Sequence, residues 1–374
     1  MYKKIWFKIH LILGLAAGII LLLVGVTGAV LSFEKEILKM INKDSYIVSI
    51  PKENHKKLET EVLLTKFQEK IPDRKINRIT FSSNANESVI INVEGKGKTA
   101  RRGMNYFVNP YTAEILPNIK GKEFFFFNLR LHRWLTLTGD NREIGKQVVA
   151  ISTVALIILS ISGVIVYWVR IKKGFFKSLL INTQSSGRPF LASLHSTIGM
   201  WVLPFYLLAS LTGLYWSYEW YRNALYTITD VEKPQRNKGK KTKVDVKNIL
   251  TFNSHQKAIE LFDDSIQKKY SSATLRIPKN GSSYTFSYLD INPDHYRARN
   301  NLTLDINTGE ILNHEKYEDK RLGEKIMQSM LPLHSGEYFG RFGQVGMFIA
   351  SALMALFTIT GFMLYFKRNK KKAK

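Results

Sequence analysis

Four histidines occupy matching positions in the two halves of the chain. His132, in the stretch LRLHRWL, is echoed by His334 in LPLH. His10 and His195 each precede one glycine by four residues and another glycine by eighteen. A neutral imidazole is a good metal ligand, and two imidazoles can fill both axial positions of a haem iron. We therefore expect two ligand pairs, His10 with His195 and His132 with His334, each holding one haem.

The absence of cysteine limits the type of haem. With no cysteine in the chain, disulfides, thiolate haem ligands, iron–sulfur clusters and covalent attachment through C-x-x-C-H are excluded. Any metal or haem would then be held by histidine, methionine or carboxylate. The chain also contains no G-x-G-x-x-G or Walker loop, so it shows no nucleotide or flavin site of its own.

Residues near the histidines also suit a porphyrin. Gly14 and Gly199 each lie one helical turn after His10 and His195, on the same helix face. A glycine at that position leaves room for a flat ring. Arg133, next to His132, is a candidate partner for a haem propionate.

Simpler explanations exist for each residue taken alone. A histidine at a membrane interface is often just tolerated there, and Gly14-x-x-x-Gly18 can serve helix packing. A zinc-type site is disfavoured, because no carboxylate repeats beside the histidines. Ionisable residues within membrane spans are costly and usually functional. Their repetition at equivalent positions favours ligation, although a duplication can also copy an idle histidine.

Four hydrophobic runs must position these histidines. Each exceeds 18 residues, enough to cross a hydrocarbon core of about 30 Å as a helix. The runs are Ile9–Phe33, Gln147–Val169, Phe190–Trp216 and Gly343–Phe366. The first is longer than the apolar core of a signal peptide and has no clear A-x-A site, so we expect an uncleaved anchor.

The net charge of +25 is explained by membrane topology rather than by nucleic-acid binding. Three segments next to the hydrophobic runs, Met1–Lys8, Val169–Ser193 and Lys367–Lys374, carry 14 basic residues and no acidic one. The positive-inside rule places them in the cytoplasm. Both large polar segments then lie outside the membrane.

The two outside segments repeat each other. NYFVNPYTAEIL (105–116) and NLTLDINTGEIL (301–312) lie 196 residues apart, and each reads as a strand, a turn and a second strand. Each follows a helical stretch, at 58–70 and at 256–268, and alternating strands. The alternating strands are predicted at Ile76–Ser82, Ser88–Val93, Ala273–Ile277 and Ser283–Tyr288. Each outside segment is therefore predicted to be a small α+β unit.

The predicted fold class is a membrane α-helical protein, with four transmembrane helices in two tandem repeats and two small periplasmic α+β units. The spans are expected within 1–33, 131–169, 190–216 and 331–366, the second and fourth preceded by a segment that carries an outer histidine. The outside units are expected at 34–130 and 217–330, a cytoplasmic loop at 170–189 and a basic cytoplasmic tail at 367–374.

Three stretches carry a resemblance to a known family: LHRWLTLTGD (131–140) leading to SISGVIVYW (160–168), the unit VNPYTAEIL (108–116), and the early span with His10. They resemble the PepSY-associated transmembrane-helix family of bacterial inner-membrane proteins, over nearly the whole chain. The resemblance implies periplasmic PepSY-like units and the same two histidine pairs. The second copy reads LHSGEY (333–338) and lacks the arginine beside the histidine.

Characterised relatives in that family are di-haem b proteins that reduce ferric siderophores. The resemblance therefore implies a haem-dependent ferric-siderophore reductase, with two b-type haems in a lipid bilayer and a ferric siderophore or other periplasmic ferric chelate as acceptor. The donor would be an unknown cytoplasmic or quinol donor. The alternative is a membrane-anchored PepSY peptide- or protein-binding regulator or transport accessory without redox activity.

Overall fold

The computed structural model describes the whole chain except residues 1, 53–55, 101, 234–250, 279–280 and 371–374. Three lysines of the predicted basic tail, at 371, 372 and 374, lie outside the described residues. The chain divides into two compact units. The helical unit comprises residues 1–34, 121–232 and 329–374, and the sheet unit comprises residues 35–120 and 233–328.

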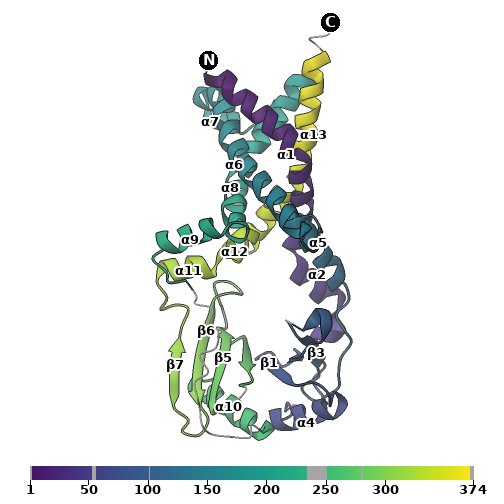
Figure 1. Cartoon of the computed structure of the whole chain (residues 1–374), viewed down its shortest axis with the longest axis vertical. Coiled ribbons are helices and arrows are strands. Elements are labelled where there is room, and N and C mark those ends of the chain that lie inside the picture. Colours follow the sequence, from purple (N-terminus) through teal and green to yellow (C-terminus); the bar gives the residue numbers. More distant parts are fainter. Residues whose placement is uncertain (1, 53–55, 101, 234–250, 279–280, 371–374) are drawn as a thin grey trace. The chain divides into compact units, whose positions relative to one another are not determined.

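Four long helices build the helical unit (Figure 1). They are α1 (Tyr2–Ser32), α6 (Asn141–Lys173), α8 (Gly187–Ser217) and α13 (Gly340–Lys370). Their most apolar 18-residue windows have mean hydropathies of 1.5 to 2.7, and 31 residues of helix span about 46 Å. The described part of the chain thus has four helices long and apolar enough to cross a membrane, at the four predicted runs.

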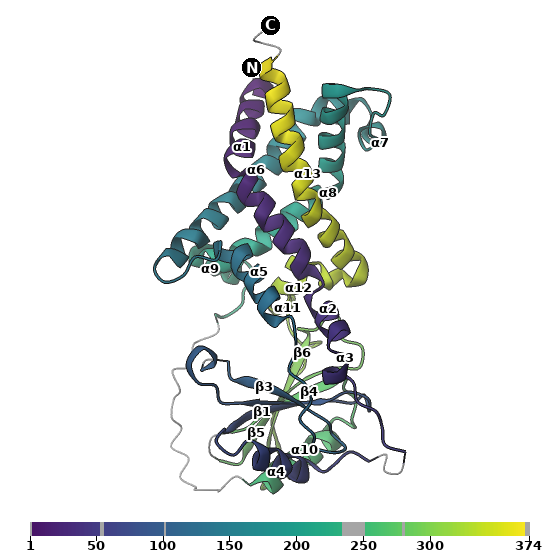
Figure 2. The ribbon, with the colours of Figure 1, turned by 90° about the vertical axis from the view of Figure 1, so that its right-hand side faces the viewer.

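Short helices connect the long ones. They are α5 (Lys122–Trp134), α7 (Phe175–Ser178), α9 (Glu219–Ile228), α12 (Met330–Ser335) and the 3₁₀ turn η2 (Glu337–Phe339). The start of α1, the end of α13 and α7 lie at one end of the helical unit, and α5, α9 and α12 lie at the other (Figures 1 and 2). The basic segments of the sequence therefore gather at a single end of this unit.

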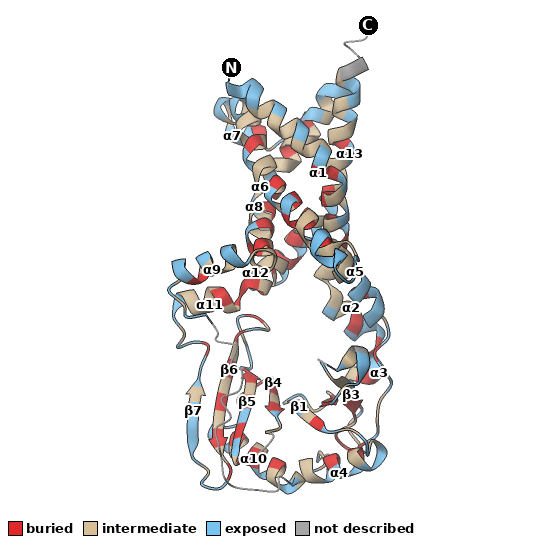
Figure 3. Cartoon of the chain, viewed as in Figure 1, coloured by how far each residue is buried: buried red, intermediate tan, exposed pale blue. Residues whose placement is uncertain are grey.

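Small residues line the interior of the helical unit. α1 contacts α6 and α13, and α8 contacts the same two helices. Their shared core is Ala17, Leu21, Ala155, Val202, Tyr206, Ala350 and Met354. Large apolar side chains such as Ile12, Ile19 and Ile151 are exposed on the outer face (Figure 3). This distribution suits a lipid solvent, in which helices associate through close packing of small residues.

Gly25 marks the closest approach of α1 to α13. A Cβ atom at Gly25 would overlap Met354 and would lie 2.8 Å from the backbone oxygen of Ser351. Backbone cannot move aside cheaply, so Gly25→Ala is expected to destabilise the helical unit by about 1–3 kcal/mol. Unfolding in detergent would measure the loss. The matched control is Gly18→Ala on the same helix, where the nearest atom would be Phe362 Cε2 at an ordinary 3.5 Å. Equal stability of the two variants would contradict this packing.

The sheet unit contains one seven-stranded antiparallel sheet in the order β3-β2-β1-β4-β5-β6-β7. The strands are β1 (Ile76–Ser82), β2 (Val89–Val93), β3 (Met104–Val108), β4 (Ser272–Arg276), β5 (Ser283–Leu289), β6 (Arg299–Asp305) and β7 (Ile311–Glu315). The first outside segment supplies β1–β3 and the second supplies β4–β7. β1 pairs with β4, with Ile79 opposite Leu275. The two segments, each expected to be an α+β unit, therefore share one sheet.

Two equivalent helices cover the core of the sheet unit. They are α4 (Thr60–Lys70) and α10 (Phe252–Ser265), which contact each other. Phe67 of α4 and Phe262 of α10 are fully buried against the sheet, and the Phe262 ring stacks on Phe286 at 4.2 Å. Alternate residues of β6 are buried, as expected for a sheet with one packed face. α10 begins four residues earlier than predicted, because Thr251 and Ser254 form a capping box.

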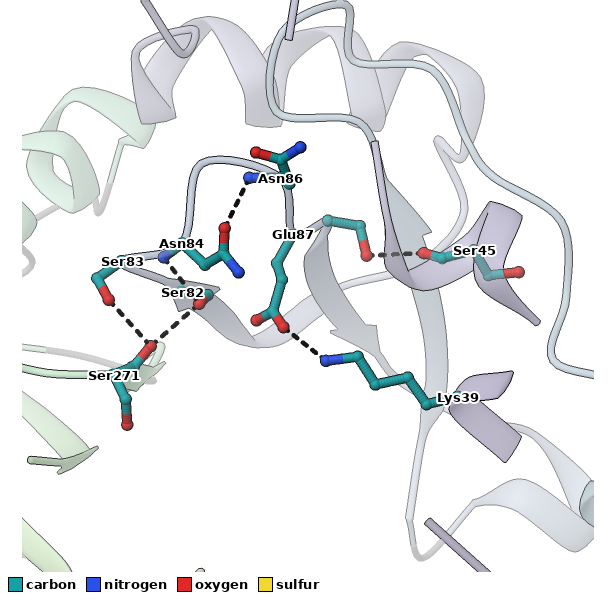
Figure 4. Close-up of polar contacts among 9 residues, drawn as sticks. Lys39, Ser45, Ser82, Ser83, Asn84, Asn86, Glu87 and Ser271 are labelled. Atoms are coloured by element: carbon teal, nitrogen blue, oxygen red, sulfur yellow. Dashed lines mark hydrogen bonds and ion pairs between the residues drawn. The ribbon is translucent and has the colours of Figure 1, made fainter. Parts of the chain in front are cut away.

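The turn between β1 and β2 connects the two outside segments (Figure 4). The hydroxyls of Ser82 and Ser83 both donate to the carbonyl oxygen of Ser271, which precedes β4. On its other side, Glu87 accepts a hydrogen bond of 2.7 Å from Lys39.

The shorter helices near these segments are α2 (Glu34–Ile41), α3 (Lys43–Tyr46), the 3₁₀ turn η1 (Gly97–Thr99) and α11 (Leu322–Gln328).

Candidate functional site

The four histidines meet in the two expected pairs within the helical unit. His10 of α1 faces His195 of α8, with ring centroids 6.2 Å apart and ring planes at 77°. His132 of α5 faces His334 of α12, with centroids 6.1 Å apart and planes at 71°. Each pair joins one histidine from the first half of the chain with one from the second half. Residues separated by about 185 and 202 positions in the sequence are thus brought to near-identical geometries.

A hydroxyl side chain holds Nδ1 of every one of these rings. Thr360 Oγ1 lies 2.7 Å from Nδ1 of His195. The same hydroxyl donates its proton to the carbonyl oxygen of Leu356 at 2.7 Å. A hydroxyl has a single proton, so Thr360 accepts from the histidine, and the ring is protonated on Nδ1. Nε2 is then left with a free lone pair, the form that binds a metal.

The other three rings repeat this arrangement. The contacts are His10 with Ser162 at 2.9 Å, His132 with Thr27 at 3.2 Å and His334 with Thr212 at 3.0 Å. Each of these hydroxyls also donates to a carbonyl of its own helix. The outer rings have a second acceptor, since Nδ1 of His132 lies 3.0 Å from Val24 O and Nδ1 of His334 lies 3.0 Å from Ala209 O.

A glycine follows each hydroxyl residue, and three of these four glycines lie close against a histidine ring. A Cβ atom at Gly28 would lie 3.3 Å from Cε1 of His132, and a Cβ atom at Gly213 would lie 3.3 Å from Cε1 of His334. At Gly163 the corresponding distance to His10 is 3.4 Å, whereas Gly361 faces open space. Sequence reasoning used these stretches only as evidence of duplication. The signal it missed is a Ser/Thr-Gly dipeptide within each of the four long helices, whose hydroxyl contacts one of the four rings.

Two further glycines hold the helices that carry the outer histidines. A Cβ atom at Gly145 of α6 would overlap the carbonyl oxygen of Trp134, the last residue of α5. A Cβ atom at Gly343 of α13 would overlap the carbonyl oxygen of Gly336, which ends α12. Each short helix therefore packs its end directly against the following long helix, and this contact fixes the depth of His132 and His334.

The ring separations fit one metal ion between two imidazoles. An imidazole nitrogen bonds a first-row metal at about 2.0–2.1 Å, and the ring centroid lies roughly 1.2 Å behind it, so two coaxial ligands place their centroids about 6.4–6.6 Å apart. The observed 6.2 and 6.1 Å lie within a few tenths of an ångström of this value. Both pairs thus have the spacing that axial ligands require.

The donor set indicates which kind of metal centre can form. Among the described residues, no group of three or more His, Cys, Asp or Glu side chains could hold a metal ion. Two histidines alone are too few for a structural zinc site, which uses four protein ligands. They suffice for a haem iron, because the porphyrin supplies the remaining four nitrogens. The residues present therefore fit a bis-histidine haem.

A cavity of about 1160 Å³ surrounds the inner pair, His10 and His195. This volume exceeds the roughly 300–1,000 Å³ of ordinary small-molecule sites, and the walls are mostly apolar. Gly14 and Gly199 both line it, as their spacing from the histidines predicts. A Cβ atom at Gly14 would meet its nearest neighbour at 3.8 Å. Gly14 is therefore at the cavity wall and not at the closest helix contact, which is at Gly25.

A family model described as the PepSY-associated TM region matches residues 7–368. The chain belongs to this family. No curated protein matches the chain. The family model spans both histidine pairs and the sheet unit, so the resemblance seen in the sequence is confirmed over nearly the whole chain.

Arg133 lies on α5 of this PepSY-associated protein, next to His132. Its side chain is exposed, and its guanidinium carbon lies 5.2 Å from the centroid of the Trp134 ring. A propionate contact by Arg133 stays a prediction.

The described histidines of the sheet unit do not pair with one another, and each contacts the hydroxyl of a tyrosine. His255 is buried and shares a 2.8 Å hydrogen bond with Tyr284, and burial lowers its pKa to about 4. His295 contacts the hydroxyl of Tyr317, and His314 that of Tyr288. Burial also lowers the pKa of His314. These side chains are polar members of the sheet unit; a further histidine, at position 55, lies outside the described residues.

Proposed function

We propose that this chain is an inner-membrane di-haem b oxidoreductase. It would pass electrons across the bilayer to a periplasmic ferric siderophore or a similar ferric chelate. The observation that supports the proposal most directly is the pair of matched histidine sites, each with hydroxyl-held rings 6.1–6.2 Å apart. A binding protein without redox activity has no need for two such sites.

The depth of the two sites supports a transmembrane path. His10 lies eight residues into α1, at the end of the helical unit that carries the basic segments. His132 and His334 lie on α5 and α12, at the opposite end. Bound haems would supply one-electron carriers at two depths, which divides a crossing of about 30 Å into shorter steps. The histidines hold the iron, the hydroxyls fix the rings and the apolar walls exclude water.

Charge supports the assignment of sides. The basic segments at the ends of α1, α6 and α13 would lie in the cytoplasm, where an unknown cytoplasmic or quinol donor would deliver electrons. The outside segments carry 18 basic against 12 acidic residues in 34–130, and 19 against 15 in 217–330, which suits an anionic chelate. Reduction would release the metal, because ferrous iron binds hard oxygen ligands less tightly than ferric iron.

A reduced-minus-oxidised absorption spectrum tests the proposal. Protein purified after expression with adequate haem is expected to show b-type bands and two haems per chain. A ferric siderophore added to the reduced protein is then expected to reoxidise it. Haem-free protein would overturn the proposal and favour a membrane-anchored regulator or transport accessory that binds peptides or proteins.

A further inference from the structure

The cavity around His10 and His195 is apolar in its walls and basic at one end. Among the described residues that line it, four are basic and none is acidic. The basic residues are Arg170 at the end of α6, Arg188 at the start of α8, and Lys367 and Arg368 near the end of α13. Three helices thus place positive charge at one end of the cavity, at the end of the unit where α1 begins and α13 ends.

Two of these arginines are equivalent in the internal repeat. Arg170 lies eight residues after Ser162, and Arg368 lies eight residues after Thr360. Ser162 and Thr360 are the residues that hold the two inner histidines. Eight helical residues correspond to about 12 Å along the axis. Both arginines therefore lie at the same distance from the histidine level, towards the same end of the unit.

The arginines have no acidic partner in the described part of the chain. Arg170 donates to the carbonyl oxygen of Leu180 at 3.1 Å, and the Arg368 guanidinium lies over the Phe7 ring at 4.9 Å. A guanidinium has five N–H donors, so each retains donors for a ligand. Arginine recognises carboxylates in a bidentate manner and tolerates partial burial. The cavity is therefore built for a ligand with an apolar body and carboxylates at one end.

We propose that Arg170, Arg188 and Arg368 bind the two propionates of the inner haem and so orient its carboxylate edge towards the cytoplasmic end. This inference rests on the proposed function, because it assumes a haem between His10 and His195. The positive charges offset the cost of placing two carboxylates next to an apolar cavity. These positive charges would also raise the midpoint potential of the iron, because positive charge near the iron disfavours the ferric state.

The test compares two triple variants of the full chain. One is Arg170→Gln, Arg188→Gln and Arg368→Gln. The matched control, Lys3→Gln, Lys172→Gln and Lys173→Gln, removes the same charge from the same end at exposed positions outside the cavity. The arginine variant is expected to fall from two haems per chain towards one. Haem that remains at the inner site is expected to have a lower midpoint potential. The control should match the unmodified protein in both measurements.

A chemical probe makes the assignment sharper. Haem-depleted protein is expected to bind haem more tightly than haem dimethyl ester at the inner site, and the arginine variant is expected to lose that preference. If the unmodified protein holds two haems and the arginine variant keeps both with unchanged potential and preference, the inference is wrong and the proposed function stands. Loss of bound anionic phospholipid without any change in haem would instead assign the arginines to lipid phosphates. Unmodified protein that contains no haem would overturn both this inference and the proposed function.

Discussion

His10→Ala or His195→Ala is expected to remove one haem completely and leave the other in place. His132→Ala or His334→Ala should remove the other haem. The reason is geometric, because each iron would depend on two rings whose centroids lie 6.1–6.2 Å apart, and the loss of one ring would leave it with a single protein ligand. Pyridine haemochrome stoichiometry would measure one haem per chain in all four variants. Redox titration would show which haem remains.

The haem that remains serves as an internal control for folding. A chain that retains its second haem with an unchanged potential has kept the helical unit intact. His314→Gln, in the sheet unit, is the matched control outside the four ligands and should keep both haems. Loss of the same single haem in all four alanine variants would refute the pairing. Retention of two haems in any of them would remove that histidine from the ligand set.

Thr360→Val is expected to weaken haem binding at the inner site by about 10–100-fold, the usual effect of losing a group that orients a ligand histidine. Thr360 is the only hydrogen-bond partner of His195 Nδ1 among the described residues. Valine has nearly the same shape and no acceptor, so the ring would lose both its orientation and its fixed protonation on Nδ1. Transfer of haem to an excess of a haem-binding acceptor protein would measure the loss.

Thr27→Val is expected to have a smaller effect at the outer site. His132 Nδ1 also contacts the carbonyl oxygen of Val24 at 3.0 Å, so its protonation is fixed without the hydroxyl. Thr360→Ser, which restores the hydroxyl, should recover most of the inner affinity. An equal loss in Thr27→Val and Thr360→Val would contradict the role of the Val24 carbonyl. A poor rescue by serine would indicate packing instead of hydrogen bonding as the cause.

Local pattern was enough to predict much of this protein. The four apolar runs exceed the thickness of a membrane, and hydrophobicity over 18 or more residues does not depend on tertiary contacts. The strand at 283–289 shows the two-residue alternation of a half-buried sheet. The equivalence of His10 with His195, and of His132 with His334, follows from counting residues in two copies of one sequence pattern.

Local pattern could not predict that the strands of the two segments form one sheet. β1 and β4 pair through backbone groups. Because backbone groups are the same in every strand, the sequence of a strand does not identify the strand that pairs with it. The hydroxyl partners of the four paired histidines were missed for a related reason. Thr27, Ser162, Thr212 and Thr360 are conventional helix residues in sequence, and their hydroxyls gain a role only when another helix brings a ring within about 3 Å.

The sequence by itself determined four membrane-length helices and the residue types that could bind haem, because these depend on composition and spacing along the chain. The tertiary structure decided that the rings of each pair face each other, that a hydroxyl fixes each ring and that basic residues from three helices share one cavity. These features depend on where helices cross. Crossing is set by close contacts such as that of Gly25 with α13, which join residues far apart in the sequence.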